Sequence, residues 1–248
     1  PSGKIAATIA DQQLAYIREQ GLDLEWILET HAHADHLSSA AYLQKKTGVK
    51  IAVGQGIMDI QQHFSHLFVQ PPEPNKQPGG FDRLVTELDC LRFGKSEIHI
   101  MATPGHTDDS ISYLIDGNVF VGDTLFMPDG GTARCDFPGG SAKELWDSIQ
   151  SILSRPDGMR LFVGHDYGKG DRKEPAWEAK VAAHKAHNIH VHARMDKATF
   201  IKTREDRDAM LPLPDLILHA LQVNLCGGNL PAEEDDGHSY FKIPANRF

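Results

Sequence analysis

The most constraining feature of this 248-residue sequence is a cluster of metal-ligand side chains directly after an apolar segment. Residues 24–28 predict a strand, and the next eight residues contain His31, His33, Asp35 and His36. Alternate residues at an extended strand end project to one side, so His31 and His33 can converge on one cation. The following turn directs Asp35 and His36 to a neighbouring point. Because buried imidazoles and carboxylates need partners, this cluster predicts a metal site at a strand end.

Three further polar segments follow predicted strands. They contain His106 after a Pro-Gly turn, Asp123 after residues 119–121, and His165 after residues 159–163. Catalytic and ligand side chains gather in the loops at strand ends of a rigid sheet. Each of the three residues alone is a weak signal. Together with the first cluster, in this order, they strongly indicate a metal site.

Helical and strand patterns alternate along the chain, which predicts a mixed α/β (α+β) class. Helices are expected over residues 8–20, 38–46 and 56–69, and behind Ser141, which has capping-box spacing to Glu144. Strands are expected over residues 24–28, 49–53, 88–93, 97–102, 110–115, 119–121 and 159–163. Residues 71–80 are rich in Pro and Gly and predict a loop, and the chain beyond about residue 171 is expected to be mostly helical.

Composition disfavours several classes of partner. The net charge is −9, which argues against a nucleic acid or an anionic membrane surface. The sequence has no apolar run of the roughly 18 residues needed to span a bilayer. Its three cysteines are widely spaced, so we expect neither a disulfide framework nor a zinc ribbon, and a reducing compartment is favoured. That compartment is expected to be the cytoplasm, or the mitochondrial matrix in a eukaryote.

The ordered ligand set resembles the signature of the metallo-β-lactamase fold superfamily, with His-x-His-x-Asp-His followed by His, Asp and His. The resemblance covers about residues 8–170 and implies an αββα sandwich with the metal site along one edge. It implies a core over residues 1–170, with 56–80 as an inserted helix and loop, and 171–248 as a helical extension of the same domain. Such folds usually begin with strands before the first helix, so the N-terminal strand region is expected to be truncated.

Within the superfamily the chain is similar to the persulfide dioxygenases (sulfur dioxygenases) and close to the glyoxalase II-type hydrolases. Residues 134–137 resemble the Arg-x-Asp-Phe element of the dioxygenases, and 165–167 resemble their His-Asp-Tyr. Residues 221–225 and 243–246 also look like that branch. Two departures affect the expected substrate entrance: the segment 56–80 lengthens the gap before His106, and residues 127–130 lie where the subfamilies differ in spacing.

The dioxygenase resemblance implies one Fe²⁺ held by His31, His106 and Asp123. Two imidazoles and one carboxylate on one face leave three coordination positions open, which iron(II) needs for a substrate sulfur and O₂. The implied reaction oxidises glutathione persulfide with O₂ to sulfite and glutathione. The remaining residues would orient these ligands by hydrogen bonds or stay as an unoccupied second site: His33, Asp35, His36 and His165.

Two alternatives remain open at this point. In a glyoxalase II-type thioester hydrolase one Zn²⁺ would bind His31, His33 and His106, and Asp123 would bridge it to a second Zn²⁺ at Asp35, His36 and His165. The two ions would lower the pKa of a bridging water for attack on a carbonyl. The other alternative is a non-catalytic module that keeps its metal for stability. The ligand set serves all three cases, and a nucleic-acid hydrolase of the same fold is disfavoured by the charge.

Two residues are candidates for substrate binding. Arg134 is interpreted as a fork-shaped donor to a glutathione carboxylate, with a structural pair to Asp136 or to a backbone carbonyl as the alternative. Tyr167 is expected to donate a hydrogen bond to the substrate, with a packed aromatic as the alternative. The histidines at 184, 187, 190 and 192 have no interleaved carboxylate and are not interpreted as a metal tract. By analogy with the family, a homodimer is expected.

Overall fold

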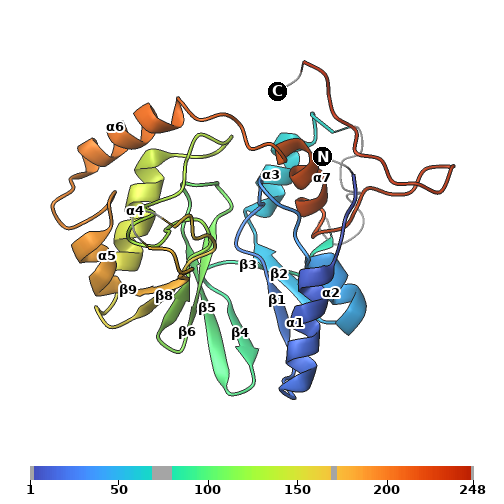
Figure 1. Ribbon diagram of the computed structural model, residues 1–248, viewed down its shortest axis with the longest axis horizontal. Coiled ribbons are helices and arrows are strands. Elements are labelled where there is room, and N and C mark those ends of the chain that lie inside the picture. Colours follow the sequence, from blue (N-terminus) through green and yellow to red (C-terminus); the bar gives the residue numbers. More distant parts are fainter. Residues whose placement is uncertain (1–2, 69–79, 169–171, 247–248) are drawn as a thin grey trace. The chain divides into compact units, whose positions relative to one another are not determined.

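The computed structural model describes residues 3–68, 80–168 and 172–246, and Figure 1 labels its elements. The chain divides into two compact units. The first unit comprises residues 1–53, 57–84 and 213–248, and the second comprises residues 54–56 and 85–212. Each unit is therefore assembled from segments that are far apart in the sequence.

The first unit contains a small sheet with the strand order β1-β2-β3. Its elements are β1 (Trp26–Leu28), β2 (Lys50–Gly54), β3 (Arg83–Val85), α1 (Thr8–Glu19), α2 (Ala40–Thr47), α3 (Ile57–Phe64) and α7 (Ile217–Asn224). β1 and β2 are parallel, with Ile27 paired to Ile51. The β2 residues Ile51, Ala52 and Val53 are fully buried, so this strand forms the centre of the unit's core.

The second unit contains a six-stranded sheet with the order β4-β5-β6-β7-β8-β9. Its strands are β4 (Cys90–Phe93), β5 (Ser96–Ala102), β6 (Ile111–Ile115), β7 (Asn118–Phe120), β8 (Arg160–Phe162) and β9 (Glu178–Lys180), and its helices are α4 (Ala142–Leu153), α5 (Val181–His187) and α6 (Lys197–Asp208). Neighbouring strands are antiparallel except for the parallel pair β7 and β8. In Figure 1, α4, α5 and α6 lie together beside this sheet.

The core of the second unit lies between the sheet and α4. Leu145, Ile149 and Ile152 on one face of α4 are fully buried together with Val119 of β7 and Leu161 of β8. Their spacing of three and four residues is that of a helix that buries a single face. Complete removal of these side chains from water stabilises the unit by about 1.5–3 kcal/mol for each large side chain.

Local signals confirm several predicted boundaries. Ser141 Oγ accepts a hydrogen bond from the Glu144 N–H at 3.2 Å, so the predicted cap of α4 is confirmed. α2 ends at Gly48, whose φ of +75° is the left-handed conformation that glycine adopts without strain. The β6–β7 hairpin turns at Asp116 and Gly117, both with positive φ, as the Asp-Gly sequence predicts.

The structure corrects other boundaries. The helix predicted over 56–69 ends at Phe64, and the predicted loop at 71–80 lies outside the described residues except for Gly80. The strand predicted from residue 88 begins at Cys90, because Thr86 donates both its N–H and its hydroxyl to Asp89 and closes a turn before it. The three-residue strands β3 and β9 were not predicted, since such short segments have no visible periodicity.

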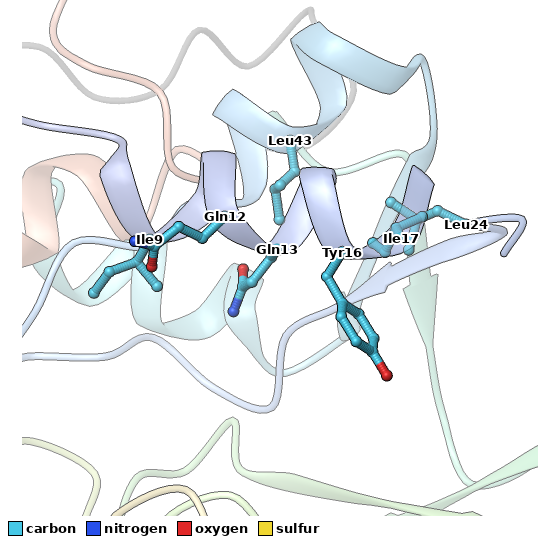
Figure 2. A pocket seen from close by; sticks show the side chains of 7 residues that line it. All are labelled: Ile9, Gln12, Gln13, Tyr16, Ile17, Leu24 and Leu43. Carbon is cyan, nitrogen blue, oxygen red and sulfur yellow. The ribbon is translucent and has the colours of Figure 1, made fainter. Parts of the chain in front are cut away.

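One apolar pocket of about 500 Å³ lies in the first unit along α1. Figure 2 shows Leu43 of α2 pointing toward α1 in this pocket. The residues that line it are Ile9, Gln12, Gln13, Tyr16, Ile17, Leu24 and Leu43. Because none of them is a metal-ligand type of side chain, this pocket is not the predicted metal site.

Among the described residues, every helix is too short or too polar to cross a membrane.

Candidate metal centre

The first ligand cluster follows β1 in the first unit. His31 is 3% exposed, and its Nδ1 lies 3.0 Å from Thr30 Oγ1, a contact that orients the ring. The ring centroids of His31 and His33 are 4.1 Å apart, and those of His33 and His36 are 4.4 Å apart. Ligand atoms of His33, Asp35 and His36 lie within 4.8 Å of one another. His33 therefore lies between the His31 ring and the side chains of Asp35 and His36 within this unit.

Two side chains from outside the cluster, Glu29 and Asn224, contact this loop. Glu29 Oε2 lies 3.3 Å from His33 Nε2, and Glu29 Oε1 accepts a hydrogen bond from the Ser38 hydroxyl. Asn224 of α7 donates from Nδ2 to the carbonyls of His33 and His36, both at 2.8 Å. The same side chain accepts the Ser38 N–H at 2.8 Å. Asn224 is 4% exposed, so a single side chain fixes three backbone groups of the ligand loop.

His106 is presented at the end of β5 by a turn that only glycine allows. Gly105 has a φ of +135°, and a Cβ there would lie 2.2 Å from the backbone nitrogen of Leu145. The turn therefore packs directly on the start of α4, and Gly105 O accepts the Ser141 N–H at 2.9 Å. This close approach holds the His106 backbone against the core of the second unit.

The role of each ring nitrogen of His106 follows from its partner. Its Nδ1 lies 2.7 Å from the carbonyl oxygen of Arg134. Because a carbonyl only accepts, Nδ1 holds the proton, and Nε2 of the neutral ring is left as the nitrogen that can bind a metal. His106 is 7% exposed, and the ring of Phe137 packs edge-on against it at 5.4 Å. The ring orientation is thus determined by residues 134–137.

Asp123 and His165 lie beside His106 in the second unit. Asp123 Oδ2 lies 3.8 Å from His106 Nε2 and 3.5 Å from His165 Nε2. Two ligands that each lie about 2.1 Å from one cation are separated by about 3.0–3.5 Å, so these spacings are close to those of ligands around a cation. Gly164 makes this approach possible, because a Cβ there would lie 2.8 Å from Asp123 Oδ1.

Arg134 forms the structural pair that was the alternative to substrate binding. Its Nε and Nη2 donate to the two carboxylate oxygens of Asp136, each at 2.6 Å, and Nη1 donates to Pro212 O at 2.7 Å. Burial acts to raise the pKa of Asp136, but the hydrogen bonds and charge of Arg134 hold that pKa below its usual value. These bonds use three of the five guanidinium N–H groups, which leaves two for a ligand.

Tyr167 is 61% exposed and stacks on His165, with ring centroids 5.7 Å apart. Its ring also meets Phe126 edge-on at 5.0 Å. The neighbouring Asp166 pairs with Arg172 and accepts the Ala176 N–H, and these hydrogen bonds hold its pKa well below the usual range. Asp166 is therefore held in place by Arg172 and the Ala176 backbone, while Tyr167 presents its ring beside a candidate ligand.

A buried network in the second unit was missed from the sequence. Asp208 of α6 accepts the Cys135 N–H at 2.8 Å and pairs with Arg204 at 2.5 Å, while Arg204 donates to Thr132 O at 3.3 Å. Arg204 and Asp208 are 4% and 3% exposed. Cys135 is buried beside Asp208, and burial together with that charge raises the pKa of the thiol to about 12. The thiol is thus a packed, protonated group, as expected for most free cysteines.

Comparison with known proteins identifies the family of the chain. Residues 2–165 match the family described as "Metallo-beta-lactamase superfamily". The "Beta-lactamase hydrolase-like protein" of Xylella fastidiosa strain Temecula1 is 48% identical over 245 residues, which is 99% of this chain but 56% of that protein. This chain therefore spans little more than half the length of that relative.

Two other relatives match over most of their own length. "Glyoxylase B2" of Dictyostelium discoideum is 42% identical over 247 residues, covering 99% of this chain and 84% of that protein. The crystal structure of ETHE1 from Myxococcus xanthus superposes with a TM-score of 0.72 at 30% identity, covering 90% of this chain and 86% of that chain. The mixed α/β fold, the His/Asp ligand clusters and these matches together place the chain in the metallo-β-lactamase superfamily of metal-dependent enzymes.

Proposed function

We propose that the protein is a glutathione-dependent persulfide dioxygenase. The overall reaction is GSSH + O₂ + H₂O → GSH + SO₃²⁻ + 2 H⁺, in which the sulfane sulfur is oxidised to sulfite, O₂ is reduced and glutathione is released. The relatives of known structure and the glyoxylase-named relative support a place among the persulfide dioxygenase and glyoxalase II-type members. The choice between these two branches rests on the residues around His106.

The observation that supports the dioxygenase most directly is the packing of residues 134–137 against His106. These residues are the element that resembles the dioxygenase branch. Arg134 O accepts the Nδ1–H of His106, and Phe137 packs edge-on against the same ring. The guanidinium of Arg134 also lies 5.1 Å from the centre of the Phe137 ring. Residues 134–137 and the candidate metal ligand His106 therefore pack against one another.

The donor set fits iron(II). We propose that His31 of the first unit and His106 and Asp123 of the second hold one Fe²⁺ through two imidazoles and one carboxylate, the ligand set of non-haem iron oxygenases. When bound, the iron supplies the redox-active centre at which the persulfide sulfur and O₂ react. The His106 Nδ1–H bond to Arg134 O and the Thr30 contact to His31 keep both imidazoles oriented.

The substrate's carboxylates need local cations, because the protein has a net charge of −9. We propose that the two remaining N–H groups of Arg134 bind a glutathione carboxylate while Asp136 keeps the guanidinium in place. Tyr167, exposed and stacked on His165, is proposed to donate its hydroxyl proton to the peptide part of the substrate. His33, Asp35, His36 and His165 would orient the iron ligands.

A second candidate is a dinuclear zinc thioester hydrolase of the glyoxalase II type. The observation that favours it is the close grouping of His33, Asp35 and His36, together with the 3.5 Å approach of His165 to Asp123. Asp35, His36 and His165 would provide ligands for a second ion, His33 would join His31 and His106 at the first, and Asp123 would bridge the two. The non-catalytic metal-binding module remains the third candidate, since it needs the same ligands without turnover.

The test is metal analysis and turnover on the same preparation. The protein is purified without added metal, and a second sample is stripped and reloaded anaerobically with Fe²⁺ or Zn²⁺. The proposal expects about one iron per chain, O₂ uptake with glutathione persulfide, and one sulfite formed per O₂ consumed. Two zincs per chain with hydrolysis of a glutathione thioester and no O₂ uptake would establish the hydrolase instead, and no turnover with either metal would support the module.

A matched pair of variants separates the two metal arrangements. His106→Gln should abolish iron binding and O₂ uptake, because it removes one of three iron ligands. His36→Gln should leave about one iron per chain if His36 is not a ligand. In the dinuclear zinc case the same His36→Gln change should lower the metal content from two ions toward one.

A further inference from the structure

The β4–β5 hairpin of the second unit gathers three side chains of metal-ligand type on its exposed face. Cys90 is paired directly with His99 across the two antiparallel strands, and Glu97 is two residues before His99. Residues two apart on a strand share a face, and directly opposed residues have Cβ atoms about 4.5–5.5 Å apart. Leu91 and Ile98 are buried on the opposite face. Pleating and register therefore bring the three side chains together toward solvent.

The donor atoms of these side chains are already close. The Cys90 sulfur, a Glu97 carboxylate oxygen and a His99 ring nitrogen all lie within 4.8 Å of one another. All three residues are exposed, so small rotamer changes can bring the donors to the separation of ligands in a tetrahedral zinc site. We propose that Cys90, Glu97 and His99 bind a zinc-like divalent cation on this hairpin, with water at the fourth position.

The chemistry of the donors selects the class of cation. Thiolate and imidazole are the ligands that zinc prefers, and a carboxylate oxygen is an accepted third ligand. Magnesium and calcium favour all-oxygen sites, so they are not expected to compete. The site uses none of the residues assigned to the superfamily's centre, which are histidines and aspartates.

One neighbouring cation opposes this site. Arg92 Nε lies 3.5 Å from Glu97 Oε1 and competes with a metal for that carboxylate. The Arg92 side chain is 83% exposed, so it can rotate into water at little cost when the carboxylate binds a cation. An Arg92→Gln variant should therefore bind the cation more tightly than the parent protein. The ligand variants should bind it more weakly, so the two kinds of substitution change the affinity in opposite directions.

The other two thiols are unsuited to metal binding. Burial raises the pKa of the Cys226 thiol, and Cys135 is buried beside the Asp208 carboxylate with a pKa of about 12. Cys90 is the exposed cysteine of the three in the chain. A spectroscopic signal from a metal–thiolate bond therefore reports on Cys90, whatever metal the His/Asp centre contains.

The experiment is a cobalt titration of the whole chain, with its own metal first loaded in the His/Asp centre. We expect a thiolate-to-cobalt charge-transfer band in the near ultraviolet that saturates at one Co²⁺ per chain below about 0.1 mM, and that Zn²⁺ abolishes by displacement. Cys90→Ser should remove the band, and His99→Gln or Glu97→Gln should weaken binding at least about tenfold. The matched control Cys226→Ser should keep the band unchanged.

Two outcomes would overturn the proposal. One is the absence of a charge-transfer band in the parent protein at these concentrations, and the other is a band that persists in Cys90→Ser. Circular dichroism of each variant checks that the fold is intact, which the exposed positions of all three residues favour. Because this site shares no residue with the His/Asp centre, its failure would leave the proposed dioxygenase activity unaffected.

Discussion

At the residue scale, Arg134 makes one contact through its backbone and others through its side chain. Its carbonyl orients His106, while its side chain is held by Asp136 and by Pro212 O. The backbone part of this role needs no arginine, because any residue supplies a carbonyl. The side-chain part depends on the planar guanidinium, which offers parallel donors that an ammonium group does not have. A substitution at position 134 can therefore separate the two roles.

We predict that Arg134→Lys raises KM for glutathione persulfide about 10- to 100-fold, the range for losing a charge-assisted hydrogen bond of about 1.5–3 kcal/mol. Iron content should not change, because the carbonyl that holds His106 is retained. Steady-state O₂ uptake and elemental analysis on one preparation test both statements. A variant with lower iron content and unchanged KM would contradict the substrate role.

The control is Arg160→Lys in the same unit. Arg160 donates through Nε to Glu178 at 2.6 Å, pairs with it through Nη2 as well, and lies 4.8 Å from the centre of the Phe162 ring. Like Arg134, Arg160 pairs with a carboxylate and lies beside a phenylalanine ring, but no candidate ligand is involved. KM should be unchanged in Arg160→Lys. A rise in KM in Arg134→Lys alone would then be due to position 134 and not to the replacement of arginine by lysine in general.

At the element scale, each unit holds an irregular segment through a helix that is distant in the sequence. α7 holds the His31–His36 loop through Asn224, and α6 holds residues 132–135 through Arg204 and Asp208. In both cases a buried polar side chain binds backbone groups of an irregular segment. Such groups are costly to leave unpaired away from water, so each helix specifies one conformation of its loop.

We predict that Asn224→Asp lowers the free energy of unfolding by about 2–5 kcal/mol, because two backbone carbonyls lose their donor and face a carboxylate. The metal affinity of the first ligand cluster should fall as well. Denaturant unfolding of the metal-loaded and stripped protein measures both effects. The control is Asn229→Asp, an exposed residue with one bond to Cys226 O, which should change neither. Equal effects at the two positions would refute the special role of Asn224.

For α6, Asp208→Asn should lower the free energy of unfolding by about 3–5 kcal/mol, since it leaves the Arg204 charge buried without its carboxylate. Asp206→Asn on the same helix breaks the exposed pair with Lys202 and should have little effect. Thermal and chemical unfolding of the two variants provide the comparison. A small effect of Asp208→Asn would mean that this buried ion pair does not organise the loop at Cys135.

At the scale of the whole molecule, the buried His184 makes stability depend on pH. His184 of α5 is fully buried, and burial lowers its pKa from 6.5 to about 4. Asn188 Nδ2 lies 3.3 Å from His184 Nδ1, so the folded protein holds the neutral ring with its proton on Nε2. Below pH 6.5 the unfolded chain gains a proton at this residue while the folded chain does not until about pH 4.

We predict that this single group lowers the free energy of unfolding progressively between pH 6.5 and 4, by at most about 3 kcal/mol, with no contribution at pH 7 and above. Denaturant unfolding at pH 7.5, 5.5 and 4.5 measures the effect as the difference between the parent and His184→Gln. The exposed His187 on the same helix provides the control His187→Gln, whose curve should parallel that of the parent. Parallel pH curves for the parent and His184→Gln would contradict the prediction.

The sequence by itself determined features that depend on a few adjacent residues. The cap at Ser141 and the turn at Asp116–Gly117 follow from local geometry, and both were predicted. The superfamily was expected from the resemblance of the ordered ligand residues to its signature, and the mixed α/β class was expected from the alternating helical and strand patterns. Backbone conformation and side-chain direction within one turn or strand depend mainly on neighbouring residues, so they can be predicted from the sequence.

Only the tertiary structure decided which distant side chains bind the backbone of the segments around His36 and Cys135. Asn224 binds a carbonyl 188 residues away, and Asp208 binds an N–H 73 residues away. The pairing of Arg134 with Asp136, left open by the sequence, was decided by the packing of residues 134–137 around His106. The strands β3 and β9 likewise form through neighbours rather than through their own three residues. These contacts arise because a buried polar group binds whichever partner the folded chain brings within reach, and no local pattern specifies that partner.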